Sequence, residues 1–130
     1  MTSAPYDSDY RVPRTTMHVG MIEGGTALNM MPTSCVFDYE IRHLPTQDPH
    51  EIVAQIDQFA QKNLVPLMQR LWDEGSIHQQ PLISYPGLHT EPGSPVIHHV
   101  KQWLAQDTNV SKISFGTEAG LFTSTLAFPL

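Results

Sequence analysis

The stretch GGTALNMMP at residues 24–32, followed closely by CVFDYEIR at residues 35–42, decides the fold of this 130-residue chain. In the second part, apolar and polar residues alternate, which is the pattern of an antiparallel strand with one buried face. The double glycine before it permits positive φ angles and a close approach of the backbone to another group. We therefore predict two strands separated by a break at the glycines, and the second strand ends on Arg42.

Two polar side chains stand at the ends of these predicted strands. The Asn29 amide follows the glycine break and the Arg42 guanidinium ends the second strand, where a carboxylated ligand can be held. Arginine suits that task because its planar fork binds a carboxylate through two hydrogen bonds. Each residue also has an ordinary structural interpretation. Asn29 can be a turn residue, and Arg42 can pair with Asp38 or Glu40 on its own face of the strand.

The flanking residues predict a strand before this stretch and a helix after it. Residues 15–23 alternate loosely and indicate a strand, with Met17, Val19 and Met21 on one face. Asp48 as N-cap and Pro49 at the first helical position begin a helix.

An apolar stripe at helical spacing continues this helix toward its predicted end at Glu74-Gly75. Pro66 should kink or interrupt it, because proline removes a hydrogen bond and clashes with the preceding turn. Trp72 and Trp103 lie on helical stripes and are predicted to be core residues, and Cys35 is predicted to be a small buried residue.

The second half of the chain predicts shorter elements. Residues 77–85 indicate a strand that Pro81 restricts to a sheet edge or a bulge. Residues 89–93 are rich in turn formers and are the best candidate for a domain boundary. A second helix begins at Ser94-Pro95, and residues 112–115 indicate a short strand. The order of elements is β-β-α-β, then a boundary, then α-β.

A loop of small residues, GTEAG at residues 116–120, follows the last predicted strand. Backbone N–H groups at a helix N-terminus can bind an anion, and the Glu118 carboxylate can pair with a cationic substrate side chain. Gly116, Thr117 and Glu118 are therefore candidate substrate-binding residues. The alternative is a capped helix start, with Thr117 as N-cap and Glu118 interacting with the helix dipole.

Composition narrows the class of protein. The chain is 40% hydrophobic and 15% charged, with a net charge of −6 and seven Lys and Arg residues. The shortage of cations argues against a nucleic-acid partner, since binding phosphates needs a basic face. The sequence has no apolar run long enough for a membrane span and no signal-peptide pattern, so we expect a cytoplasmic protein with no membrane partner.

Two motifs, residues 15–45 and SFGTEAGLF at residues 114–122, closely resemble the acetylornithine deacetylase family of the dimeric di-zinc aminoacylase/carboxypeptidase superfamily. The resemblance implies an α/β (α+β) fold: a partial ferredoxin-like antiparallel sandwich (β-β-α-β), then an α-β remnant of the catalytic domain. It divides the chain into a loop or disordered lead-in at residues 1–14, a partial dimerisation domain at residues 15–88, and a partial catalytic domain at residues 89–130. On this basis the chain begins inside the dimerisation domain and is a fragment.

The resemblance also implies a function. The family uses zinc (or cobalt) to hydrolyse N-acyl amino acids, such as acetylornithine in arginine biosynthesis, and it works as a homodimer. The matching asparagine, arginine and glycine-rich loop of the family contact the substrate, which assigns that role to Asn29, Arg42, Gly116, Thr117 and Glu118. The asparagine of the family reaches across the dimer into the partner's active site.

The metal-binding motifs of the family are missing from this sequence, so we assign no catalytic and no metal-binding residue. The seven histidines include no pair at the i, i+4 spacing that places two imidazoles on one helix face. We therefore predict that the chain alone is inactive. Two alternatives remain open: a desuccinylase or carboxypeptidase of the same superfamily, against which Glu118 argues, or a stand-alone ferredoxin-like dimerisation or small-molecule-binding module.

Overall fold

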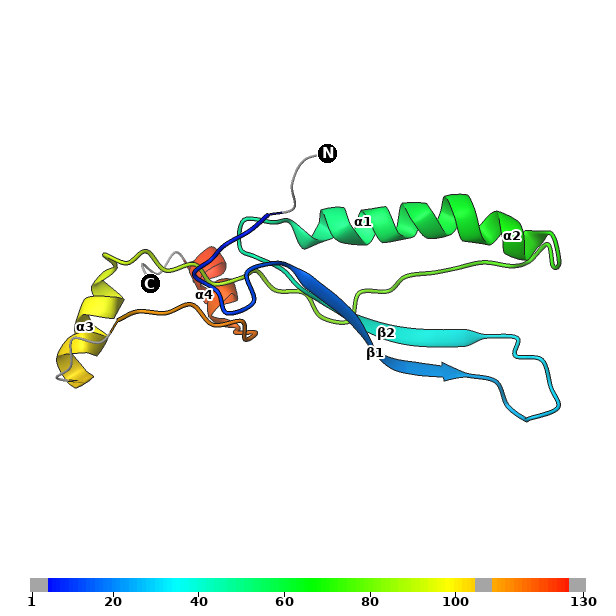
Figure 1. Cartoon of the computed structure of the whole chain (residues 1–130), viewed down its shortest axis with the longest axis horizontal. Coiled ribbons are helices and arrows are strands. Elements are labelled where there is room, and N and C mark those ends of the chain that lie inside the picture. The colour runs from blue at the N-terminus through cyan, green and yellow to red at the C-terminus, as the bar shows by residue number, and fades with distance from the viewer. Residues whose placement is uncertain (1–4, 105–108, 127–130) are drawn as a thin grey trace.

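The computed structural model describes residues 5–104 and 109–126, and it has a mixed α/β fold (Figure 1). A small two-stranded antiparallel sheet is followed by helices, which agrees with a partial ferredoxin-like domain and confirms the predicted fold class. The elements, in chain order, are β1 (Thr16–Gly24), β2 (Cys35–Arg42), α1 (Pro49–Phe59), the π-helix η1 (Ala60–Leu64), α2 (Val65–Gln69), α3 (Pro95–Leu104) and α4 (Ala119–Leu126).

Strands β1 and β2 are the two predicted strands, they pair as an antiparallel hairpin, and Gly25 has the expected positive φ angle of 80°. The register contains one irregularity, because Val19 pairs with Tyr39 and Met21 with Asp38, which leaves Gly20 without a cross-strand partner. Such a bulge changes which residues share a face.

Because of the bulge, the prediction that Met21 shares a face with Met17 and Val19 is wrong. Beyond Gly20, Ile22 pairs with Phe37 and so takes the place on this face that we expected for Met21. We call this side of the sheet the apolar hairpin face, and it consists of Met17, Val19, Ile22, Phe37, Tyr39 and Ile41.

Helix α1 begins where the capping residues predict. Asp48 has an extended backbone (φ −76°, ψ 115°), and its Oδ1 accepts a hydrogen bond from the His50 backbone N–H at 2.8 Å. The predicted interruption near Pro66 is also present, as the π-helical turn η1 directly before α2. A wider turn accommodates the missing N–H and the bulk of the proline ring.

The helix ends at Gln69, earlier than the predicted end at Glu74-Gly75. The backbone N–H groups of Leu71 and Trp72 both bond to the Met68 carbonyl, each at 3.0 Å, so the last turn closes on one acceptor. The chain then reverses, and Gly75 packs tightly against Met68.

Both predicted strands in the second half are wrong. Residues 77–85 form no strand and run between the helix and β2 (Figure 1). Side chains hold this segment, because Gln61 Nε2 donates to the Ile77 carbonyl at 2.8 Å and the Tyr39 hydroxyl donates to Gln79 Oε1. Pro81 cannot donate to a strand ladder, which is one reason the pairing does not form. Residues 112–115 make only one isolated parallel bridge, between Lys112 and Tyr10.

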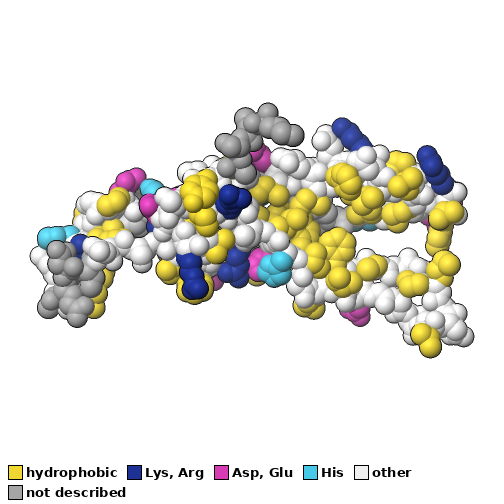
Figure 2. All heavy atoms as spheres, in the orientation of Figure 1, with side chains coloured by type: hydrophobic (Ala, Val, Ile, Leu, Met, Phe, Trp, Pro, Cys, Tyr) yellow, Lys and Arg dark blue, Asp and Glu magenta, His cyan; other side chains and the backbone are white. Residues whose placement is uncertain are grey.

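The core is small. In the part of the chain that the structure describes, the buried hydrophobic residues are Leu44, Ala60 and Val65. Cys35, Trp72 and Trp103 were predicted to be buried and are exposed instead. Figure 2 shows apolar side chains on both sides of a gap between the helix and the hairpin. Most of the apolar hairpin face therefore remains in contact with water.

Candidate functional site

An open groove of about 770 Å³ lies at the start of α4 and contains the predicted GTEAG loop. One wall is the segment before Pro86, and the other is the loop with the first turns of the helix. The lining residues are Ile83, Ser84, Tyr85, Gly116, Thr117, Glu118, Ala119, Leu121 and Phe122. Three of the five predicted site residues thus line one groove, whose volume falls within the usual range of small-molecule sites.

The loop leads directly into α4, as expected for a capped helix start. Thr117 Oγ1 accepts a hydrogen bond from the Ala119 backbone N–H at 3.2 Å, and the Glu118 carbonyl accepts from Leu121 N–H at 2.9 Å. Gly116 lies against the Tyr85 hydroxyl, where a side chain would overlap it. Thr117 therefore supplies a side-chain bond at the helix start, but α4 begins at Ala119, so Glu118 rather than Thr117 stands at the N-cap position.

Arg42 reaches the same region from the end of β2. Its Nη1 donates to the Ser114 carbonyl at 3.1 Å, two residues before Gly116, and its Nε lies 2.5 Å from Glu40 Oε1. The ion pair with Glu40 is one that the sequence suggested, and at half exposure it contributes little to stability. A guanidinium has five N–H donors, and these two contacts use two of them.

Asn29 is the predicted site residue that the structure does not bring to this groove. It lies in the turn from Ala27 to Met30, where the Met30 N–H donates to the Ala27 carbonyl at 3.2 Å. This turn is at the far end of the hairpin from α4 (Figure 1). Within a single chain, Asn29 is therefore a turn residue.

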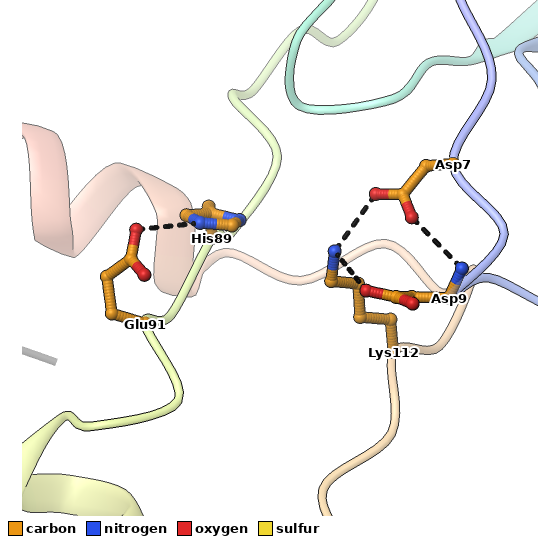
Figure 3. A network of polar contacts seen from close by, with 5 residues as sticks. All are labelled: Asp7, Asp9, His89, Glu91 and Lys112. Atoms are coloured by element: carbon orange, nitrogen blue, oxygen red, sulfur yellow. Dashed lines mark hydrogen bonds and ion pairs between the residues drawn. The ribbon is translucent and has the colours of Figure 1, made fainter.

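The sequence reasoning missed a charged cluster around Lys112, four residues before the GTEAG loop (Figure 3). Lys112 Nζ lies 2.9 Å from Asp7 Oδ2 and 3.1 Å from Asp9 Oδ2. The same ammonium lies 5.3 Å from the centre of the Tyr10 ring. We call Asp7, Asp9, Tyr10 and Lys112 the lysine clamp. No local pattern could have revealed it, since its two sides are 105 residues apart.

The clamp should weaken at both extremes of pH. The hydrogen bond from Lys112, followed by that from the Asp9 backbone N–H, lowers the pKa of Asp7 below its ordinary 3.8, and the two aspartates raise the pKa of Lys112 above its ordinary 10.5. The Asp7 contribution is thus complete above pH 3.8 and is lost as the pH falls through the lowered pKa. The Lys112 contribution is complete below pH 10.5 and is lost above it.

A pH series of NMR spectra would check this window. We expect the Tyr10 and Lys112 resonances to be constant between about pH 4.5 and 9.5, where the ion pair between Asp7 and Lys112 is complete. They should change together below about pH 4. A midpoint for Asp7 at or above 3.8 would contradict the assigned ion pair.

The described residues do not fit a zinc site. Across residues 5–104 and 109–126, no group of three or more His, Cys, Asp or Glu side chains is arranged to hold a metal ion. Accordingly, no chemical step is assigned here to zinc. In the same part of the chain, none of the helices has the length and apolar character needed to cross a membrane.

Comparison with known proteins identifies the family. The model of the peptidase dimerisation domain of the M20 family matches residues 2–68, just over half of the chain, and the chain belongs to this family. It is also 32% identical over 119 residues to acetylornithine deacetylase of Myxococcus xanthus. That alignment covers 90% of this chain and 29% of the relative, so the chain spans less than a third of the relative's length. No solved structure matches the chain significantly.

Proposed function

We propose that this chain is part of a zinc-dependent amidohydrolase that removes the acyl group from N-acyl amino acids. The reaction is the hydrolysis of N2-acetyl-L-ornithine to L-ornithine and acetate, a step of arginine biosynthesis carried out in the cytoplasm. The family membership and the similarity to an acetylornithine deacetylase support this proposal. In it, the chain contributes to the homodimer interface and to substrate binding, while the metal ligands lie outside this sequence.

One observation carries the substrate assignment: Arg42 bonds to the Ser114 carbonyl, two residues before the loop whose Gly116, Thr117 and Glu118 line one groove. Acetylornithine has a carboxylate on its α-carbon and an ammonium at the end of its side chain. Arg42 offers guanidinium N–H donors for the carboxylate, and Glu118 offers a carboxylate for the ammonium. In this assignment, Gly116 and Thr117 form the groove wall between them, and Asn29 acts from the hairpin turn on the site of the partner subunit.

A chimaera tests the assignment. The aligned segment of the Myxococcus xanthus enzyme is replaced by the aligned segment of this chain, and ornithine release is measured with zinc or cobalt present. We expect activity from the chimaera and none from the 130-residue chain alone, because substrate-positioning residues cannot replace the metal and the general base. Hydrolysis of acetylornithine by the purified chain above a mock preparation would contradict the second expectation.

Glu118→Gln in the chimaera tests whether the Glu118 carboxylate binds the side-chain ammonium of acetylornithine. The KM for acetylornithine should rise about tenfold, the size of one charge-assisted hydrogen bond, whereas the KM for N-acetyl-L-methionine should not change. Glu51→Gln, which removes an exposed carboxylate in the first turn of α1, is the matched control and should affect neither substrate. An equal effect of Glu118→Gln on both substrates would refute the pairing. Faster turnover of an N-succinyl amino acid would favour the desuccinylase alternative.

A further inference from the structure

Residues 110–115 lead into the candidate groove, yet they belong to no helix or sheet. Their backbone makes one isolated bridge, between Lys112 and Tyr10. The position of the following loop therefore depends on a few individual contacts. Two of these are polar: the lysine clamp at residue 112 and the Arg42 bond to the Ser114 carbonyl.

The turn that carries the two aspartates of the clamp is held by hydrogen bonds of its own, in addition to the contacts with Lys112. Asp7 Oδ1 accepts a hydrogen bond from the Asp9 backbone N–H at 3.0 Å, and the Tyr10 N–H donates to the Asp7 carbonyl at 3.3 Å. The Asp7 N–H in turn donates to the Pro13 carbonyl at 3.0 Å, close to the start of β1. A folded turn next to the sheet thus presents two carboxylates to one ammonium.

The charges explain why Lys112 matters more than one surface ion pair. Asp7 and Lys112 are partly buried, with side-chain exposures of 28% and 31%. Lys112 separates two carboxylates that would otherwise repel each other across a short turn. Its replacement by a neutral residue would remove the attraction and leave that repulsion uncompensated.

We propose that Lys112 is a positioning residue, which, through Asp7 and Asp9, holds the Gly116–Glu118 loop in place beside Arg42. The segment from the clamp to the loop is short: Ser114 is two residues beyond Lys112, and Gly116 is four. The consequence for substrate affinity rests on the proposed function. The placement of the loop does not, and it can be measured in the chain itself.

A spin label tests the placement in the full 130-residue chain. Ser8 is exposed between the two aspartates, so a nitroxide on Ser8→Cys, in a Cys35→Ser background, should broaden the amide resonances of residues 113–118. Lys112→Gln should lower the equilibrium constant for the docked loop about fivefold, the upper range for an exposed ion pair, and so reduce this broadening, whereas Lys112→Arg should preserve it. Lys62→Gln, which removes an exposed ammonium in η1, is the matched control and should have no effect.

An exchange of the two charges distinguishes loss of the ion pair from a variant that fails to fold. Lys112→Asp should abolish the broadening, and the double variant Asp7→Lys, Lys112→Asp should restore most of it. Full broadening in Lys112→Gln would overturn the proposal, as would an equal loss in Lys112→Arg, since charge would then not be the cause.

Kinetics of the chimaera separate this proposal from the proposed function. Lys112→Gln should raise the KM for acetylornithine about fivefold with an unchanged kcat, and Lys112→Arg should leave both unchanged. Activity with an unaltered KM in Lys112→Gln would overturn the role of the clamp in substrate binding while leaving the proposed function intact. An inactive parent chimaera would count against the proposed function, and the spin-label result would then decide the placement alone.

Discussion

Ile22→Glu should weaken self-association of the 130-residue chain, which we expect to form dimers or larger species at high micromolar concentration. Ile22 is 72% exposed and, with its partner Phe37, forms the pair of the apolar hairpin face that lies nearest the turn. Burying an isoleucine contributes about 1.5–3 kcal/mol, and a carboxylate in its place would have to be desolvated. We therefore expect association to weaken at least tenfold, measured by light scattering or sedimentation.

Met21→Glu is the matched control for this prediction. Met21 is next to Ile22 in the chain and 67% exposed, but its cross-strand partner is Asp38, so it lies on the opposite face of the hairpin. The net charge of −6 opposes association only weakly, since salt screens charges beyond about 8 Å. A monodisperse monomer of the unaltered chain at high micromolar concentration would contradict the prediction, and equal effects of the two variants would show that the apolar hairpin face is not the contact.

Gly120→Ala should release α4 from the rest of the chain. A methyl group at this buried position would overlap the Pro86 backbone carbonyl, and a backbone group cannot turn aside as a side chain can. Overpacking of this kind costs about 1–3 kcal/mol. We expect the α4 amides to lose their hydrogen-exchange protection while those of β1 and β2 keep theirs.

Two further glycines make this prediction specific. A methyl group at Gly116 would meet the Tyr85 hydroxyl at the end of a side chain, so Tyr85→Phe should partly rescue Gly116→Ala but not Gly120→Ala. Gly93→Ala is the control, because no atom lies within 4 Å of the position its methyl group would occupy. Retained protection of α4 in Gly120→Ala would mean that the helix does not need its close approach to Pro86.

The features predicted correctly from the sequence depend on neighbouring residues. The cap at Asp48, the positive φ angle at Gly25 and the interruption before Pro66 each follow from the chemistry of a few adjacent positions. The wrong predictions depend on pairing. Residues 77–85 have strand-like composition, but whether they join a sheet is decided by a partner strand, and here side-chain bonds to Gln61 and Tyr39 replace the ladder.

In the candidate site, too, individual residues could be predicted from the sequence, whereas contacts between distant residues could not. The GTEAG loop and Arg42 could be named from the sequence, but their meeting at the Ser114 carbonyl could not, because the residues are 72 positions apart. The bulge at Gly20 was missed because alternation alone does not show an unpaired residue, and it moves Ile22 to the face expected for Met21. The substrate roles of all five residues remain predictions.

The separation of 105 residues between Asp7 and Lys112 has a consequence for synthesis of the protein. At about 5–20 residues per second on the ribosome, the two aspartates emerge roughly 5–20 s before their lysine. The backbone bonds of the hairpin and of α1 join residues close in sequence, and such elements can form within milliseconds of emerging. The clamp therefore closes after the hairpin and α1 have emerged, and of the described helices and strands only α4 emerges later. During that interval, any cation that reaches Asp7 and Asp9 competes for the place of Lys112.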